Sequence, residues 1–258
     1  MSALAPSLRV YEFWLLQYRR VWRGTVITSV VNPVFYLGAL GVGLGTLVNR
    51  SGGQPLGVSY IDFVAPGMLA ATAMQIASGE STWPVMGSFR WTRQYFAMLA
   101  TPLGVRDILA GHQLWMITRV ASTSTVYLAV IAAFGGINSP LGMLALPAVV
   151  LLGVAFTAPI AAYAATQDSD GAFVPLNRFV IIPMFLFSGT FFPVSRLPLA
   201  LEWVAYATPL WHGVDLCREL TLGTVHPLRA LGHIAYLLVF VVVGLLWGER
   251  TYARRLLK

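Results

Sequence analysis

Residues 120–167 read VASTSTVYLAVIAAFGGINSPLGMLALPAVVLLGVAFTAPIAAYAATQ and contain no Asp, Glu, Lys or Arg. An α-helix of about 20 apolar residues crosses a hydrocarbon core of roughly 30 Å, so this run is too long for one crossing. The sequence GGINSP at 135–140 combines Gly, Asn, Ser and Pro, which is a turn signal in the middle of the run. The stretch therefore predicts two membrane-spanning helices, at 103–134 and 141–166, joined as a hairpin.

The rest of the chain has the same character. Hydrophobic residues make up 57% of its 258 residues and charged residues 10%, whereas a soluble domain carries roughly 25% charged residues. Four further uncharged runs of span length predict helices at 24–48, 60–80, 176–192 and 228–247. The first of these is expected to bend at Asn32 and Pro33. We predict an all-α membrane protein in which residues 1–258 form a single domain with six transmembrane helices.

Three amphipathic segments lie between or before these spans. Residues 7–23 mix Trp, Phe and Val with arginines, which predicts an interfacial helix in the headgroup region with Ser7 as its N-cap. Residues 83–101 are too polar to span, and they predict a short helix at 89–100 that lies along the membrane face. Residues 193–226 combine prolines, tryptophans and mixed charges, which favours an amphipathic segment over a seventh crossing.

Arginine placement predicts the orientation, because basic residues are retained on the cytoplasmic side of a membrane. With the N-terminus inside, six crossings also put the C-terminus inside. Outside lie only Arg50, Arg196, Arg218 and Arg229, whereas the cytoplasmic group is Arg9, Arg19, Arg20, Arg23, Arg90, Arg93, Arg106, Arg178, Arg250, Arg254, Arg255 and Lys258. The net charge of +7 therefore indicates contact with anionic lipid headgroups and no nucleic-acid partner.

Catalytic and metal-binding motifs are missing from the sequence. No G-x-x-x-x-G-K-[ST] motif occurs, so the chain is not expected to hydrolyse ATP itself. The four histidines, His112, His212, His226 and His233, lack the spacing of a metal motif, and we predict neither metal ligands nor catalytic residues. Ser188 together with His212 or His233 would be the one candidate for an intramembrane protease dyad, although Ser-Gly pairs are ordinary packing elements of membrane helices.

Two groups of residues are candidates for a substrate path. Arg119 lies inside its predicted span, past the headgroups, where a cation either contacts the anionic headgroup of a substrate, or forms a structural pair or snorkels to the interface. Aromatic residues crowd the fifth span and the segment after it, where they either line a path for an amphiphile or form an interfacial belt and pack helices. These aromatic candidates are Phe185, Phe187, Phe191, Phe192, Trp203 and Trp211.

The order of parts resembles the permease subunits of ABC-2 type transporters. The most specific stretch is FSGTFFPVSRLPLALEWVAYATPLWHGVDLCRELTLG at 187–223, which is similar to that family's C-terminal pattern of S-G-x-x-F-P, then L-P, then P-L and an acidic-x-x-R-x-x-x-x-G ending. FFPVSRLP and PLWHGVDLCR are most similar to the lipooligosaccharide and nodulation-factor exporter branch, which is also related to drug-exporter permeases. The order of spans covers nearly the whole chain, and the detailed motif covers this one stretch.

The resemblance implies an exporter permease of the bacterial plasma membrane that moves a lipid-linked glycan, a lipid or a hydrophobic drug. Its partners would be a second permease copy, as a homodimer or heterodimer, and a separate ATPase subunit that binds ATP and Mg²⁺, with no cofactor in this chain. Residues 193–226 would form a re-entrant outward gate. An intramembrane enzyme (a protease or lipid transferase) and a secondary transporter remain alternatives. Residues carried over as ATPase-coupling are Phe89, Arg90, Trp91, Arg93, Gln94 and Tyr95.

Overall fold

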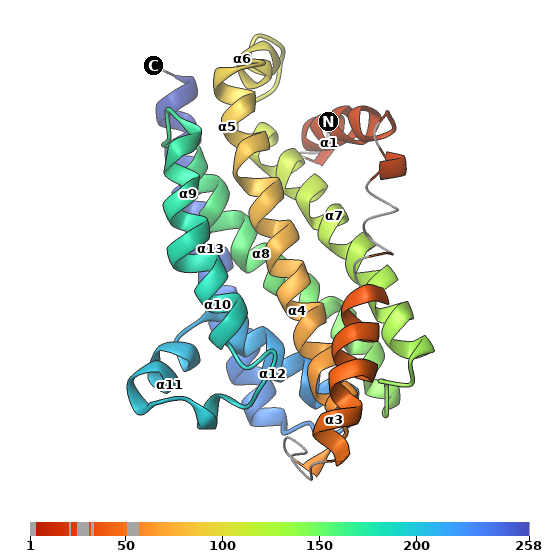
Figure 1. The fold of residues 1–258 in the computed structure, drawn as a ribbon. Coiled ribbons are helices and arrows are strands. Elements are labelled where there is room, and N and C mark those ends of the chain that lie inside the picture. Colours follow the sequence, from red (N-terminus) through yellow and green to blue (C-terminus); the bar gives the residue numbers. More distant parts are fainter. Residues whose placement is uncertain (1–3, 21, 25–30, 32–33, 51–56, 258) are drawn as a thin grey trace.

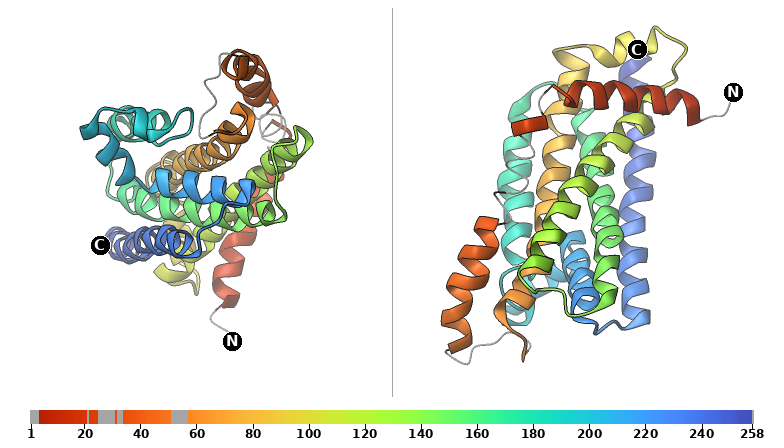
Figure 2. Two further views of the ribbon diagram at one scale, coloured as in Figure 1. Left: turned by 90° about the horizontal axis from the view of Figure 1, so that it is seen from below. Right: turned by 90° about the vertical axis from the view of Figure 1, so that its right-hand side faces the viewer.

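The chain forms a bundle of long helices, and helices α1 (Leu4–Tyr18) and α6 (Gln94–Leu99) lie across one end of it (Figures 1 and 2). The computed structural model describes residues 4–20, 22–24, 31, 34–50 and 57–257, and within these ranges all regular structure is helical. Five helical stretches are long and apolar enough to cross a membrane: Tyr60–Arg90, Val105–Ala133, Pro140–Ala164, Asp170–Phe187 and Pro227–Leu256. The prediction of an all-α membrane protein is therefore confirmed.

The predicted first span can be compared only in part. An apolar helix covers Val34–Val48 and includes the π-helix η1 (Leu37–Leu44), after which α3 (Gly45–Arg50) completes the segment. The π-helical turn falls in a run with glycine at positions 38, 41, 43 and 45. The expected bend at Asn32 and Pro33 lies outside the described residues.

Helix α8 (Ala145–Ala164) is the centre of the bundle, and the 3₁₀-helix η3 (Pro140–Leu144) leads into it. Its neighbours come from most of the chain: α4 (Tyr60–Ser81), α7 (Val105–Ala133), α12 (Pro209–Leu222) and α13 (Pro227–Leu256). Small residues allow these contacts. A Cβ atom on Gly153 would lie 2.6 Å from Val120 of α7, and one on Gly213 of α12 would lie 2.5 Å from Leu152. Glycine at these positions lets α8 contact two helices closely.

The fifth span begins earlier and ends earlier than the predicted range 176–192. It runs from η4 (Asp170–Ala172) through α9 (Phe173–Leu176) and η5 (Asn177–Ile181) to α10 (Ile182–Phe187). Ser188 caps its end, and Gly189 follows with φ = +80°, a left-handed conformation that stops the helix. Phe191 and Phe192 therefore lie in the turn beyond the span, and the predicted helical position for these two residues is wrong.

The last helix, α13, is longer than the predicted span 228–247. It continues to Leu256 through the charged sequence ERTYARRL. Tyr252 and Leu256 are buried in a second hydrophobic core that also contains Trp14, Phe89 and Tyr95, and this packing keeps the charged stretch helical. The C-terminal stretch is thus part of the bundle rather than a basic tail.

Helix α1 (Leu4–Tyr18) lies crosswise over one end of the long helices (Figure 2, right). Val10 and Trp14 are buried against α7, while Leu8, Phe13 and Leu16 are exposed. This geometry suits the predicted interfacial helix. Ser7 is not its N-cap, because the helix begins at Leu4 and the Ser7 hydroxyl donates instead to Asp107 Oδ1 of α7 at 3.3 Å.

Gly111 of α7 sets how closely α1 approaches the bundle. A Cβ atom there would lie 2.5 Å from both the Ser7 carbonyl oxygen and Val10 Cβ, so Gly111→Leu is expected to push α1 away. Maleimide labelling of a Val10→Cys probe should then be at least about 10-fold faster, since the only native cysteine, Cys217, is buried. Gly232→Leu is the control, because a Cβ there meets nothing within 4 Å. Unchanged labelling would show that α1 is not held by this contact.

Candidate functional site

An elbow of two short helices, α5 (Trp83–Arg90) and α6 (Gln94–Leu99), lies at the end of the bundle that also holds both termini (Figures 1 and 2). The two helices meet at Arg93, which adopts the left-handed region with φ = 51°, a conformation uncommon for arginine. The predicted single helix at 89–100 is therefore wrong. It is interrupted because α5 prolongs α4 along the bundle axis, whereas α6 lies across the end of the bundle.

The six predicted coupling residues divide into two groups at this elbow. Phe89 and Tyr95 are buried with their rings 4.8 Å apart, and both contact the ring of Tyr252 from α13. Tyr95 also forms a hydrogen bond with the buried His112 of α7. These two side chains hold the elbow on the bundle. The solvent-facing residues are Arg90, Trp91 and Arg93, with Gln94 half-buried.

The loop that follows α8 is tied to the elbow by Asp168. Its Oδ1 lies 3.0 Å from Arg255 Nη2 on α13 and 3.7 Å from Arg90 Nη1 on α5. Arg255 also donates to the carbonyl oxygens of Ala165 and Gln167, at 2.6 and 2.7 Å. Because the Asp168 carboxylate is largely exposed, the ion pairs themselves contribute little stability. The hydrogen bonds of Arg255 with the two carbonyl oxygens are what join α13 to the end of α8.

Arg119 is paired rather than free. Its Nε lies 2.9 Å from Glu80 Oε1, and its Nη1 donates to the Tyr18 hydroxyl at 3.0 Å. The guanidinium also lies 4.6 Å from the centre of the Tyr18 ring. Arg119 thus forms a structural pair with Glu80, which is one of the alternatives that the sequence left open. Together with Tyr18 this pair joins α1, α4 and α7. The Arg119 side chain still lines the wall of a cavity of about 420 Å³, together with Trp14, Trp83, Trp91 and Trp115.

A second cavity, of about 350 Å³, lies between α4 and the fifth span. Its wall is mixed in character. Gln75 and Asn177 contribute exposed amides, and Phe185 is the one predicted path residue that lines it. Exposed amides within membrane-spanning helices are costly against lipid, which indicates that this face meets water, substrate or protein. The residues lining the cavity are Gln75, Ser78, Gly79, Thr82, Trp83, Phe173, Leu176, Asn177, Ile181, Ile182 and Phe185.

The other predicted aromatic residues do not form one continuous path. Phe187 lines a separate apolar cavity of about 410 Å³ between α10 and α11 (Leu199–Tyr206). Phe191 packs against Phe185 with ring centres 5.2 Å apart, and Phe192 is half-buried in the same turn. Trp203 is 67% exposed, as expected for an interfacial belt. Trp211 packs on Tyr206, 4.7 Å away, and joins α11 to α12.

Arg218 of α12 is a functional candidate that the sequence did not reveal as such. Its side chain is 6% exposed and donates to the carbonyl oxygens of Phe63 at 3.2 Å and Gly189 at 2.8 Å. The guanidinium also stacks 3.9 Å above the Phe63 ring. A Cβ atom on Gly67 would lie 2.9 Å from the Thr190 carbonyl oxygen, so glycine allows this turn to reach α4. Arg218 thereby fixes the turn after the fifth span to α4.

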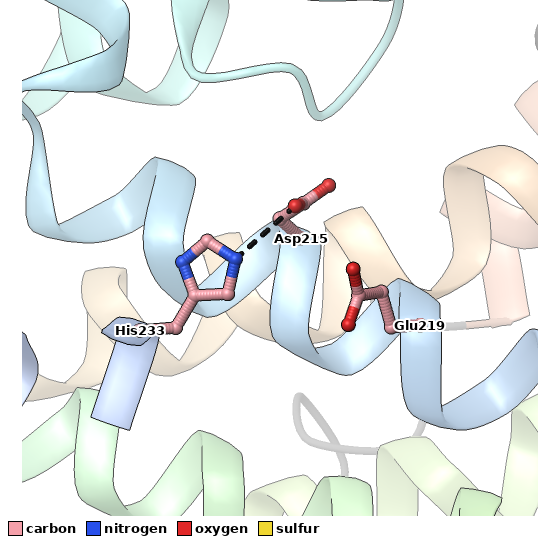
Figure 3. A group of neighbouring side chains, drawn as sticks. All are labelled: Asp215, Glu219 and His233. Carbon is pink, nitrogen blue, oxygen red and sulfur yellow. Dashed lines mark ion pairs between the residues drawn. The ribbon is translucent and has the colours of Figure 1, made fainter. Parts of the chain in front are cut away.

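A polar cluster joins α12 to α13, as Figure 3 shows for Asp215, Glu219 and His233. His233 Nε2 lies 3.3 Å from Asp215 Oδ2, and His233 Nδ1 lies 2.8 Å from Nδ1 of His212. Burial opposes ionisation of Asp215, but the adjacent His233 imidazole and the charges of Arg218 and Arg229 outweigh it, so the pKa of Asp215 is lowered. Burial and the neighbouring His233 lower the pKa of His212 to about 4, so His212 is neutral at pH 7.

The sequence did not predict this cluster, because its residues come from two different helices. Asp215 and Glu219 lie four residues apart on one helix face, with Arg218 between them in the sequence, and this spacing was the only local signal. His233 belongs to the next helix. The Ser188 hydroxyl of the suggested protease dyad forms its hydrogen bond with Thr208 at 2.9 Å, and among the described residues none joins it to His212 or His233.

Comparisons with known proteins agree with this architecture. The family model of the ABC-2 type transporter matches residues 11–222. Nodulation protein J of Rhizobium leguminosarum bv. viciae is 35% identical over 253 residues, which cover 95% of each chain. Nodulation protein J of Rhizobium meliloti (strain 1021) is 34% identical over 95% of this chain and 94% of its own. The inner membrane transport permease YadH of Escherichia coli (strain K12) is 22% identical over 88% and 86%. The chain belongs to the ABC-2 type transporter family, as a transmembrane permease of an ABC exporter.

Proposed function

We propose that this permease exports an amphiphile, with a lipid-linked glycan as the first choice and a lipid or hydrophobic drug as the others. The cavity between α4 and the fifth span carries the proposal. Amides of Gln75 and Asn177 and the hydroxyls of Ser78 and Thr82 suit a polar headgroup, while Phe173, Leu176, Ile181, Ile182 and Phe185 suit an acyl or prenyl chain. A purely apolar drug would leave the amides without partners.

The exposed faces of the spans support a second permease copy as partner. The exposed side of α13 between Leu231 and Trp247 is entirely apolar, as lipid contact requires. The fifth span is also mostly exposed, but it carries Asn177 and Arg178 among Phe179 and Val180. A protein partner satisfies such a mixed face better than lipid does. We place the second copy, identical or homologous, on this side, so that the amphiphile would move between the two copies.

The family implies an ATP-binding cassette ATPase as partner, and we place its docking surface at the elbow of α5 and α6. Both termini and the exposed Arg90, Trp91 and Arg93 lie at this end of the bundle. Basic residues are retained on the cytoplasmic side, so this end is proposed to face the cytoplasm of a bacterial inner membrane. ATP and Mg²⁺ would bind to the ATPase subunit, and this chain would move in response to its closure.

The test is ATP hydrolysis by the permease co-expressed with the ATPase encoded beside it and reconstituted in nanodiscs. A glycolipid is expected to stimulate hydrolysis several-fold, whereas the same lipid without its sugar should stimulate less. Gln75→Leu with Asn177→Leu should abolish the difference and leave basal hydrolysis unchanged. Val239→Leu on the lipid-facing side of α13 is the control. Equal stimulation of wild type and the double variant by the glycolipid would contradict the assigned cavity, and failure to co-purify any ATPase would contradict the assigned partner.

A further inference from the structure

Three buried polar atoms without hydrogen bonds converge between α12 and α13. They are Asp215 Oδ2, Glu219 Oε1 and His233 Nε2, and none has a hydrogen-bond partner among the described residues. Their contacts are ion pairs only: Asp215 Oδ2 lies 3.3 Å from His233 Nε2, and Glu219 Oε1 lies 3.6 Å from Arg229 Nη1. Glu219 is 6% exposed and His233 is 5% exposed. Native proteins rarely leave such atoms unsatisfied, because each costs about 1–3 kcal/mol. Convergence of three of them on one point indicates that a further partner belongs there.

We propose that Asp215, Glu219 and His233 bind a divalent transition-metal ion, with Zn²⁺ as the best-suited species. One potential ligand atom from each residue lies within 4.8 Å of the others. Ligands of a tetrahedral Zn²⁺ lie about 2.0–2.2 Å from the ion and hence roughly 3.3 Å from one another, a spacing that small side-chain rotations reach. One imidazole and two carboxylates favour such an ion over Mg²⁺ or Ca²⁺, which prefer oxygen ligands alone.

His212 completes the arrangement as a positioning residue. Its Nδ1 lies 2.8 Å from His233 Nδ1, so one hydrogen bond joins the two rings. When His233 donates through Nδ1–H, its Nε2 carries a free lone pair directed at the cluster (Figure 3). Metal-binding histidines usually donate their second ring N–H to a carboxylate, a backbone carbonyl or water, which fixes the tautomer, and here the ring nitrogen of His212 would take that role. The opposite arrangement would place the proton on Nε2 and block metal binding.

The competing account is an internal ion-pair cluster in which His233 pairs with Asp215 at 3.3 Å and Arg229 neutralises the two carboxylates. Arg229 Nη1 lies 3.6 Å from Glu219 Oε1, and its Nη2 lies 4.0 Å from Asp215 Oδ2. These distances exceed those of hydrogen bonds, and the Arg229 side chain is 61% exposed. It is therefore free to move into solvent when an ion binds. The ion would fasten the segment 193–226 to the last span, near the end of the bundle opposite the termini (Figure 1).

Calorimetry with ZnCl₂ alone tests the proposal on the permease purified without a polyhistidine tag and stripped with a chelator. We expect one Zn²⁺ per chain. Asp215→Asn and His233→Gln should each weaken binding at least 100-fold, and His212→Gln should weaken it about 10- to 100-fold. His226→Gln is the matched control, since this exposed histidine should leave affinity unchanged. Absence of binding in wild type, or wild-type affinity in Asp215→Asn, would overturn the proposal.

Arg229→Gln separates the two accounts directly. Removing the competing cation should tighten Zn²⁺ binding several-fold if the metal site exists, whereas a pure ion-pair cluster would lose stability and gain no affinity. Thermal unfolding guards against misfolded variants: Zn²⁺ should raise the Tm of wild type and of His226→Gln, but not that of the isosteric Glu219→Gln. A Zn²⁺-dependent rise in Tm of equal size in Glu219→Gln would refute the assignment of that ligand.

Discussion

Replacing Arg218 by Met is expected to lower the free energy of unfolding by about 2–4 kcal/mol and to abolish export. The guanidinium donates to the carbonyl oxygens of Phe63 and Gly189 in a buried place, and their loss leaves each oxygen short of a donor, at about 1–3 kcal/mol each. Met has similar length, so the loss is of donors and charge more than of volume. The turn after the fifth span should then separate from α4. Thermal unfolding and export assays measure the two effects.

Two further variants make the Arg218 prediction specific. Arg196→Met removes an exposed arginine from the same segment and should leave Tm unchanged. Arg218→Lys keeps the charge but cannot donate to two carbonyl groups through a planar fork, so it should lie between wild type and Arg218→Met. If Arg218→Met unfolds at the wild-type temperature, Arg218 does not stabilise this part of the bundle.

Reversal of both charges in Arg90→Glu with Arg93→Glu is expected to reduce ATP-driven export at least 10-fold while membrane insertion persists. Both side chains are exposed on the elbow that we assign to ATPase docking. Charge reversal at a docking surface replaces attraction by repulsion, and a loss of about 1.4 kcal/mol already gives a 10-fold effect. Export should be measured beside co-purification of the ATPase, since the defect is expected in both.

The matched control for this variant is Arg250→Glu with Arg254→Glu. It makes the same change in net charge on exposed residues near the C-terminus, so any general effect on topology would appear there too. Asp168→Asn removes the ion pairs with Arg90 and Arg255 without reversing a charge, and it separates loss of that contact from loss of docking. Unchanged export in Arg90→Glu with Arg93→Glu would count against the elbow as the coupling surface.

The sequence predicted the spans well where apolar runs end at clear turn or cap signals. The hairpin at 103–134 and 141–166 corresponds to Val105–Ala133 and Pro140–Ala164, and the span at 60–80 corresponds to Tyr60–Ser81. Ser59 accepts from the Asp62 amide at the start of the latter helix, which is a local signal that residue types alone supply. Prediction failed where tertiary packing extends a helix, as in the charged end of α13.

The sequence did not predict which side chains contact one another. The buried contacts of Phe89 and Tyr95 with Tyr252 join segments far apart in the chain. The local sequence therefore does not distinguish an exposed aromatic helix face from one that packs against the bundle. The same holds for Asp215, Glu219 and His233, whose proximity depends on how α12 packs against α13. The roles of Arg90, Trp91, Arg93 and Gln94 in coupling remain predictions.

Helices α4 and α5 form nearly one rod from Tyr60 to Arg90, with a bend at Thr82. At 1.5 Å per residue its 31 residues measure about 46 Å, roughly 16 Å more than the hydrocarbon thickness. The rod is therefore long enough to carry the elbow beyond the hydrocarbon core and to act as a lever. Arg218 holds the rod at Phe63, near one of its ends. A tilt of the rod by about 5° around this point would move the elbow about 4 Å sideways. At the ATPase docking surface that we propose on the elbow, a small tilt of the rod within the bilayer would thus become a displacement of several ångströms.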